Sequence, residues 1–133
     1  MEIIKAWLLN SVINLTFGFS FNKKIVDVRL NSVIRLVFRY KFNQRTIGNL
    51  PNSIIHLIFG ECINRDIKNG IPKSITHLTF SRDSNHDITS SKNILNSVKL
   101  LVINNNYKYK LTLKLNINSA LQSYNNINIM YYY

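Results

Sequence analysis

Apolar and polar residues alternate in one short motif that returns along the whole chain. The motif opens with a serine, and apolar residues stand one, four and six positions after it. The six copies open at Ser11, Ser32, Ser53, Ser74, Ser97 and Ser123, with spacings of 21, 21, 21, 23 and 26 residues. A period near 21 residues is typical of a solenoid, in which each repeat forms one coil that stacks on its neighbours.

The second half of each copy predicts a β-strand. The apolar residues at positions four and six stand two apart, so a strand turns both toward one face and the residues between them toward the other. The pattern V-x-x-L-x-F matches the strand of a leucine-rich repeat, L-x-x-L-x-L. We therefore expect a β-rich solenoid of about six coils of about 21 residues, with a parallel sheet on its concave face.

Two further apolar positions recur ten and fourteen residues after the serine, where the chain must return to the next strand. We expect these to be the inward residues of the return arms: Phe21, Phe42, Ile63, Ser84 and Tyr107, then Ile25, Thr46, Ile67, Ile88 and Leu111. Gly48 with Pro51 and Gly70 with Pro72 mark turns before the third and fourth copies. A row of serine hydroxyls is expected to bond the backbone at these turns.

The repeats predict one domain over residues 1–133, because no linker composition interrupts them. Residues 1–8 are expected to cap the first coil, through apolar residues that include Trp7, and 130–133 to form a C-terminal tail that closes the stack. The end strands of an open sheet present unpaired backbone, so a homo-oligomer formed by edge pairing is the main alternative to capping.

The strings LPNSIIHLIFG at 50–60 and GIPKSITHLTF at 70–80, with Phe-Asn at 21–22 and 42–43, resemble the FNIP repeat. This is a leucine-rich-repeat-like unit found mainly in social amoebae and in giant DNA viruses that infect amoebae. The resemblance implies an interaction scaffold that binds a protein partner and has neither catalytic activity nor a cofactor. Copies one and two depart from the family at Leu9 and Leu30, where it has Pro.

The outward strand residues form the concave sheet, the usual binding face of such solenoids. Neighbouring parallel strands lie about 4.8 Å apart, so Arg35, His56 and His77 are predicted to form one row. Arginine and aromatic side chains are enriched where binding energy concentrates. The candidate partner-binding residues are Phe19, Arg35, Arg39, Tyr40, His56, Glu61, His77 and Arg82. Repetition of His by simple duplication of the unit is the alternative interpretation.

Catalytic and metal chemistry find little support in the sequence. His56, His77 and Glu61 approximate a two-His, one-carboxylate set, but no motif such as H-E-x-x-H accompanies them, so we expect no metal site. Cys62 has no evident base beside it and stands where leucine-rich repeats use Asn or Cys at a turn. The six acidic residues are scattered. We therefore expect that the protein is not an enzyme.

The net charge of +11, from 17 Lys plus Arg against 6 Asp plus Glu, raises an alternative function. A basic protein can associate with nucleic acid through salt-sensitive, non-specific contacts. However, the basic residues of the return arms, among them Lys24, Arg45 and Arg65, are expected to spread over the convex side, and no nucleic-acid motif accompanies them. Abundant Asn, Ile and Lys have AT-rich codons, so part of this charge follows from base composition.

Targeting signals are weak. The apolar start is interrupted by Asn10 and Asn14, and no run approaches the roughly 18 apolar residues of a membrane span. A single cysteine, Cys62, fits a reducing intracellular compartment, so we expect a cytoplasmic protein, such as one in an infected host cell, without a membrane partner.

Overall fold

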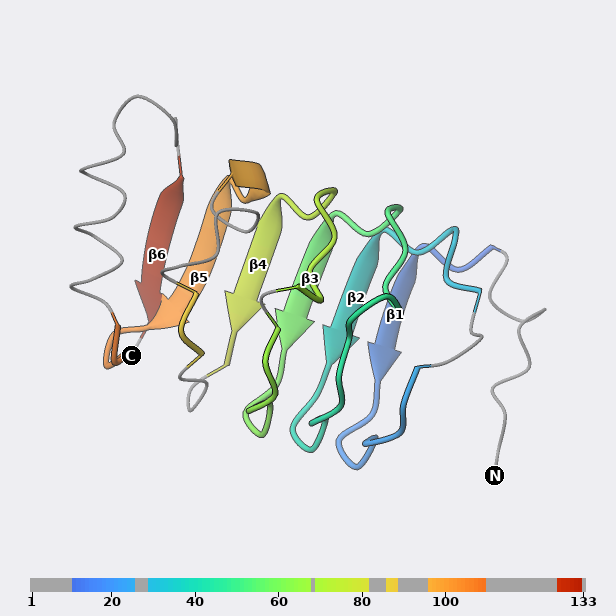
Figure 1. The fold of residues 1–133 in the computed structure, drawn as a ribbon, viewed down its shortest axis with the longest axis horizontal. Coiled ribbons are helices and arrows are strands. Elements are labelled where there is room, and N and C mark those ends of the chain that lie inside the picture. Colours follow the sequence, from blue (N-terminus) through green and yellow to red (C-terminus); the bar gives the residue numbers. More distant parts are fainter. Residues whose placement is uncertain are drawn as a thin grey trace.

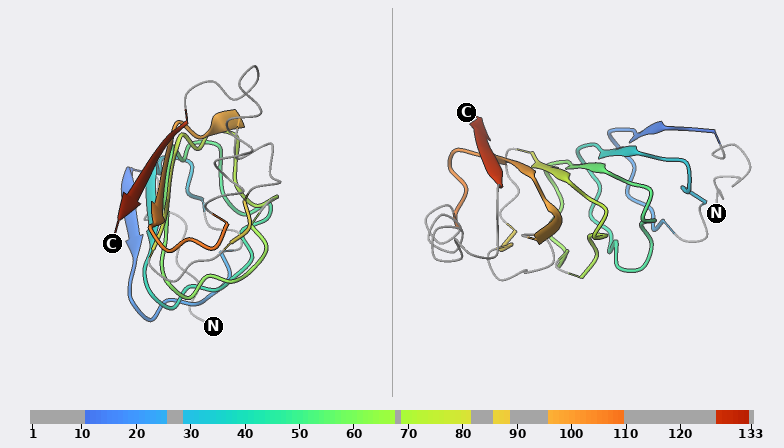
Figure 2. Two further views of the ribbon diagram at one scale, coloured as in Figure 1. Left: turned by 90° about the vertical axis from the view of Figure 1, so that its left-hand side faces the viewer. Right: turned by 90° about the horizontal axis from the view of Figure 1, so that it is seen from above.

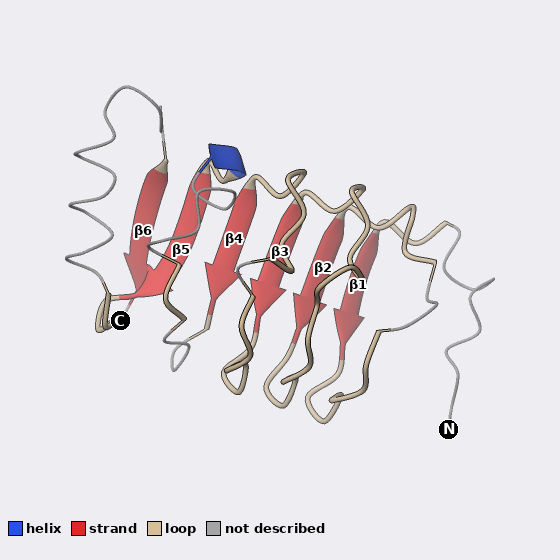
Figure 3. Cartoon of the chain, in the orientation of Figure 1, coloured by secondary structure: helices blue, strands red, loops and turns tan. Residues whose placement is uncertain are grey.

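A computed structural model describes residues 11–25, 29–67, 69–81, 86–88, 96–109 and 127–132. These residues contain six short strands: β1 (Asn14–Phe17), β2 (Arg35–Phe38), β3 (His56–Phe59), β4 (His77–Phe80), β5 (Leu100–Asn104) and β6 (Asn128–Tyr132). The strands form one sheet in chain order, and every neighbouring pair is parallel (Figures 1 and 3). The predicted fold class, a leucine-rich-repeat-like solenoid with a parallel sheet, is confirmed.

The solenoid makes about four turns, fewer than the predicted six coils. Six strands are joined by five returns. The last return includes residues 110–126, which lie outside the described part of the chain, as do Ser84 and Leu111. Seen along the stack, the coils superpose, with the sheet on one side and the return arms on the other (Figure 2).

The core lies between the sheet and the return arms. Positions one, four and six after each serine are fully buried in the three central coils, which gives three columns of side chains. They are Val33, Ile54 and Ile75; Leu36, Leu57 and Leu78; and Phe38, Phe59 and Phe80. The predicted inward residues of the arms are buried too, at Ile25, Phe42, Thr46, Ile63, Ile67, Ile88 and Tyr107. The pattern of the sequence therefore fixes which face of every strand enters the core.

Phenylalanine rings stack along this core at the spacing of the coils. The ring centroids of Phe17 and Phe38 lie 5.4 Å apart, and those of Phe38 and Phe59 lie 5.7 Å apart. Phe80 continues the column at 5.8 Å from Phe59. Because each ring packs on those of the neighbouring coils, identical residues at one position make each coil a template for the next.

The sixth copy pairs in a different register from the one its serine predicts. Counting from Ser123 places Ile127 and Ile129 opposite Leu101 and Ile103, but the structure pairs Ile129 with Leu101 and Tyr131 with Ile103. The prediction of this register was wrong by two residues. Met130, Tyr131 and Tyr132 consequently belong to β6 rather than to a tail beyond the last strand. The proposed cap at 1–8 lies outside the described residues.

Polar side chains join neighbouring coils as well. The Ser53 hydroxyl donates to the Leu30 carbonyl at 3.1 Å, and the Ser74 hydroxyl donates to the Ile54 carbonyl at 2.8 Å. The acceptors lie 23 and 20 residues earlier in the chain, about one repeat away, so these serines connect coils rather than closing their own turns. Such bonds hold the stack in register at the edge of the core.

A row of asparagines, Asn22, Asn43 and Asn64, connects the return arms of neighbouring coils and is called the asparagine ladder below. The backbone N–H of Asn43 donates to Asn22 Oδ1 at 2.9 Å, and that of Asn64 donates to Asn43 Oδ1 at 3.1 Å. Each asparagine follows an inward residue by one position, and the side-chain oxygens of Asn22 and Asn43 accept from the next coil. The second residue of the Phe-Asn pair therefore has a structural role.

Candidate partner-binding face

The face of the sheet that points away from the core, called the open face below, begins with a row of polar side chains at the amino ends of the strands. Arg35 pairs with His56 across β2 and β3, and His56 pairs with His77 across β3 and β4. The imidazole rings of His56 and His77 are stacked, with centroids 4.2 Å apart. The predicted row is thus present, since equal repeat lengths place equivalent residues side by side.

Both histidines are half-buried. Burial lowers the pKa of the His56 imidazole, and the adjacent His77 and Arg35 lower it further because a positive charge on a neighbour disfavours a second one on His56. His56 is therefore neutral at pH 7 and stacks on His77 without repulsion between two cations. The Thr76 hydroxyl lies 2.8 Å from Nδ1 of His77 and shares a hydrogen bond with that ring.

An apolar row runs across the middle of the open face. Val37 pairs with Ile58, and Ile58 pairs with Thr79, through residues one position before the buried phenylalanines. These side chains are half-buried because neighbouring strands cover their flanks and leave their tips exposed. The row offers apolar surface that a partner can cover.

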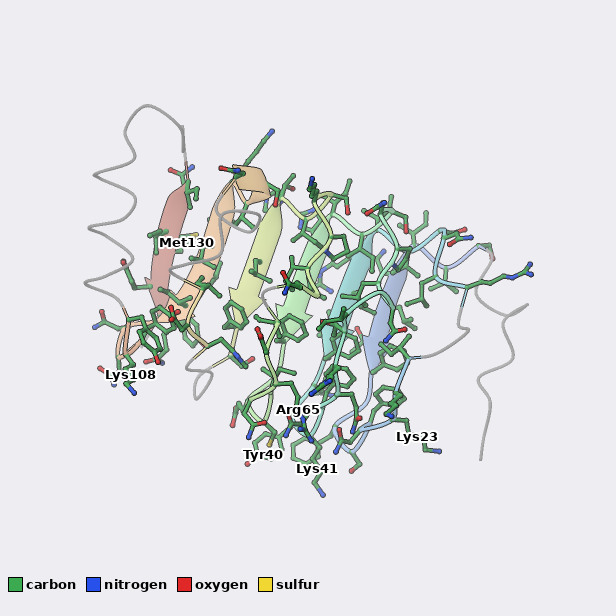
Figure 4. All side chains as sticks on the ribbon, in the orientation of Figure 1. Lys23, Tyr40, Lys41, Arg65, Lys108 and Met130 are labelled. Carbon is green, nitrogen blue, oxygen red and sulfur yellow. The ribbon has the colours of Figure 1, made fainter. Side chains whose placement is uncertain are left out.

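A hollow of about 280 Å³ lies where the chain leaves the carboxyl ends of β1 to β4. It is lined by Phe19, Val37, Phe38, Arg39, Tyr40, Ile58, Gly60, Glu61 and Ser81. The rings of Phe19 and Tyr40 stack over it with centroids 4.7 Å apart, although 53% of Phe19 and 39% of Tyr40 remain exposed. Figure 4 shows Tyr40 on the loops beyond the strand ends.

Four of the predicted site residues, Phe19, Arg39, Tyr40 and Glu61, thus line one hollow, while Arg35, His56 and His77 form the row at the other end of the strands. Arg82 lies outside the described residues. Gly60 and Ser81 were not among the candidates predicted from the sequence, and they belong to the hollow because successive loops approach one another there. Their position seven residues after the coil serine, shared with Arg39, was the available signal.

The described residues offer little for metal or thiol chemistry. Among them, no group of three His, Cys, Asp or Glu side chains is placed to hold a metal ion. Cys62 is a free, half-buried cysteine whose backbone N–H donates to the Tyr40 carbonyl at 3.0 Å. Within the same residues, no helix has the length and apolar character needed to cross a membrane.

The fold and its open face define a class of protein, the leucine-rich-repeat-like solenoids with a single parallel sheet. Within that class, the FNIP repeat model matches residues 31–62, which include β2 and β3. The resemblance to FNIP repeats is confirmed, and the chain contains an FNIP repeat.

A solved structure extends this likeness. The chain is similar to CroV588 of the giant virus CroV, whose crystal structure is described as a novel circular LRR protein. The two share 41% sequence identity with a TM-score of 0.61, over 71% of this chain and 14% of CroV588. The chain therefore matches only a small part of the length of that protein. No curated protein matches the chain.

Proposed function

We propose that the protein is a non-catalytic scaffold that binds a protein partner through the open face of its sheet. FNIP repeats and leucine-rich-repeat-like solenoids are families of non-catalytic repeat proteins, and their fold is commonly used for protein interaction. The observation that carries the proposal is the exposed, stacked Phe19–Tyr40 pair over the hollow. Exposed aromatic side chains beside an apolar surface are typical of the residues that dominate binding energy.

The proposed contact surface has three parts that suit a protein segment better than a small molecule. Arg35, His56 and His77 supply hydrogen bonds and charge at one end of the strands. Val37 and Ile58 supply apolar contact in the middle. At the other end, Arg39 and Glu61 flank the aromatic pair. The arrangement spans the four neighbouring strands β1 to β4, so we expect a partner to lie across the sheet.

The test is quantitative crosslinking and mass spectrometry in the native cell with three forms of the chain. One is the wild type, one carries Arg39→Glu and Tyr40→Ser on the open face, and the matched control carries Arg29→Glu and Ile13→Ser, which precede strands. Arg29 and Ile13 are exposed like Arg39 and Tyr40, so charge and apolar area change similarly.

We expect at least one protein that the wild type and the control enrich equally and that the open-face variant loses about tenfold or more. Melting temperatures of the three forms establish that each is folded. Equal enrichment of every protein by all three forms, or no protein enriched over background, would contradict the proposal.

A further inference from the structure

We propose that the return arms carry a second binding site, a row of cations that takes a linear polyanion of phosphate groups. The site is formed by Lys24, Arg45 and Arg65 on three successive arms, away from the open face. Its geometry does not depend on the function proposed for the sheet.

The repeat places these three cations at nearly the same position of each coil. Lys24 and Arg45 stand thirteen residues after Ser11 and Ser32, and Arg65 stands twelve after Ser53. The asparagine ladder of residues 22, 43 and 64 lies just before them and holds the three arms in register. The arm of Arg65 is tied down further, because its Nε donates to the Asn43 carbonyl at 3.4 Å.

A hollow of about 540 Å³ brings the three side chains together. Its lining is Lys24, Gln44, Arg45, Ile47, Asn49 and Arg65, so the described residues around it include three cations and no carboxylate. A second hollow of about 460 Å³ shares Arg45, Ile47 and Arg65 and adds Asn64 and Asp66. Because Asp66 lines only the second hollow, the first hollow, which includes Lys24, is the more positive of the two. Figure 4 shows Arg65 among the return arms.

For Lys24, Arg45 and Arg65, this arrangement corrects the expectation that the basic residues of the return arms spread over the convex side. The repeat period predicts their positions along the chain. Only the stacking of the coils shows that the three side chains, which stand 21 and 20 residues apart, share one hollow. Like charges held at the spacing of stacked coils repel one another, and a bound anion relieves that repulsion.

The chemistry of the row favours phosphate chains over other anions. Guanidinium groups bind phosphate oxygens in bidentate pairs, and a lysine ammonium adds a compact charge. Because the cations repeat along the stack, a ligand whose charges repeat along its length meets all three, whereas a single phosphate meets one or two. No aromatic ring lines either hollow among the described residues, so binding is expected to involve the backbone of the polyanion and to ignore base sequence.

The experiment measures binding of a labelled oligothymidylate to the purified chain over a series of salt concentrations. The site variant carries Lys24→Gln, Arg45→Gln and Arg65→Gln. The matched control carries Arg29→Gln, Lys73→Gln and Lys99→Gln, three exposed cations that precede strands. Both variants lose three positive charges. The double variant Lys24→Gln with Arg45→Gln leaves the Arg65–Asn43 bond intact, and its melting temperature separates loss of binding from loss of fold.

We expect the site variant to bind at least about tenfold more weakly at low salt than the control. The slope of the logarithm of the association constant against the logarithm of the salt concentration should become shallower by about two, as expected for three lost phosphate contacts on a single strand. Inorganic polyphosphate should displace the oligonucleotide, whereas polyglutamate of equal charge should do so poorly. Displacement by polyphosphate supports a general phosphate site, and binding of the oligonucleotide without such displacement supports a nucleic-acid strand as the ligand.

Three results would overturn the proposal. The first is absence of binding by the wild type at low salt. The second is an equal loss of affinity in the site variant and the control, which would mean that only the overall charge matters. The third is displacement by polyglutamate as efficient as that by polyphosphate.

Discussion

Gly60 and Gly18 occupy the same position, seven residues after the coil serine, yet the structure confines only Gly60. A Cβ atom on Gly60 would overlap the carbonyl oxygen of Arg39 in the preceding coil, whereas a Cβ on Gly18 would meet none of the described residues within 4 Å. The close approach of two loops therefore explains Gly60 at the hollow. Conformational freedom does not explain it, because the one glycine with positive φ among the described residues is Gly48.

We expect Gly60→Ala to lower the free energy of unfolding by about 1–3 kcal/mol, the usual cost of forcing an atom into a packed site. Gly18→Ala, the matched control, should be neutral or raise it by about 0.4–1 kcal/mol, because it restricts the unfolded chain. Urea denaturation of both variants measures the difference. Equal stability of the two variants would contradict the observed loop contact.

Thr46 is the exception among the inward residues of the return arms. Its equivalents are Ile25, Ile67 and Ile88, and its hydroxyl oxygen is buried without a hydrogen-bond partner among the described residues. The sequence predicted that Thr46 points inward, but it could not show an unpaired hydroxyl, which depends on the positions of neighbouring atoms.

Thr46→Val should raise the free energy of unfolding by about 1 kcal/mol, since it removes a buried polar atom at nearly constant shape. Thr79→Val on the open face, where the side chain reaches solvent, should change it by less than about 0.5 kcal/mol. Thermal and urea unfolding of the two variants provide the comparison. A Thr46→Val protein less stable than the wild type would show that the hydroxyl has a partner.

At the scale of the element, strands and return arms differ in how they are held. The strands combine a sheet with columns of buried leucine and phenylalanine, while the arms have no regular strand among the described residues and depend on side chains such as the asparagine ladder. The arms are therefore more sensitive to the loss of a single polar group on their surface.

We expect Asn43→Ala to lower the free energy of unfolding by about 0.5–1.5 kcal/mol, because the Asn64 N–H loses its acceptor. Asn43→Asp keeps an oxygen at the same place and should remain close to the wild type. Hydrogen exchange of the Asn64 amide is the most direct readout, and it should accelerate in the alanine variant alone. Equal exchange rates of the Asn64 amide in the three proteins would contradict the hydrogen bond between Asn64 and Asn43.

The strands also show how much of the fold the sequence period predicts. Strands β1 to β5 were predicted at their observed positions, because Leu and a second large apolar residue mark them at fixed distances from serine. The sixth strand was placed two residues too early. Ile127, Ile129 and Tyr131 stand two residues apart, and a shift of two leaves every side chain on the same face, so the apolar pattern cannot choose between the two registers.

For the whole molecule, stacking in register turns repeats in sequence into rows in space. It brings together Arg35, His56 and His77 on the open face, a row that the spacing alone predicted. It also forms the two features that spacing did not reveal, the aromatic hollow and the cation row of the return arms. Those depend on how irregular loops approach one another, and loop conformation is not encoded by an apolar period.

Disulfide trapping tests this register most directly. In a Cys62→Ser background, one protein carries Val37→Cys with Ile58→Cys, which are Cα partners, and the control carries Val37→Cys with His56→Cys, two residues out of register. Neighbouring parallel strands lie about 4.8 Å apart, within the range for a disulfide, whereas the offset pair lies about 8 Å apart. Mild oxidation followed by mass spectrometry should show rapid, nearly complete crosslinking of the first pair and little of the second. Equal crosslinking of both pairs, or faster crosslinking of the offset pair, would contradict the stacked solenoid on which both proposed sites are built.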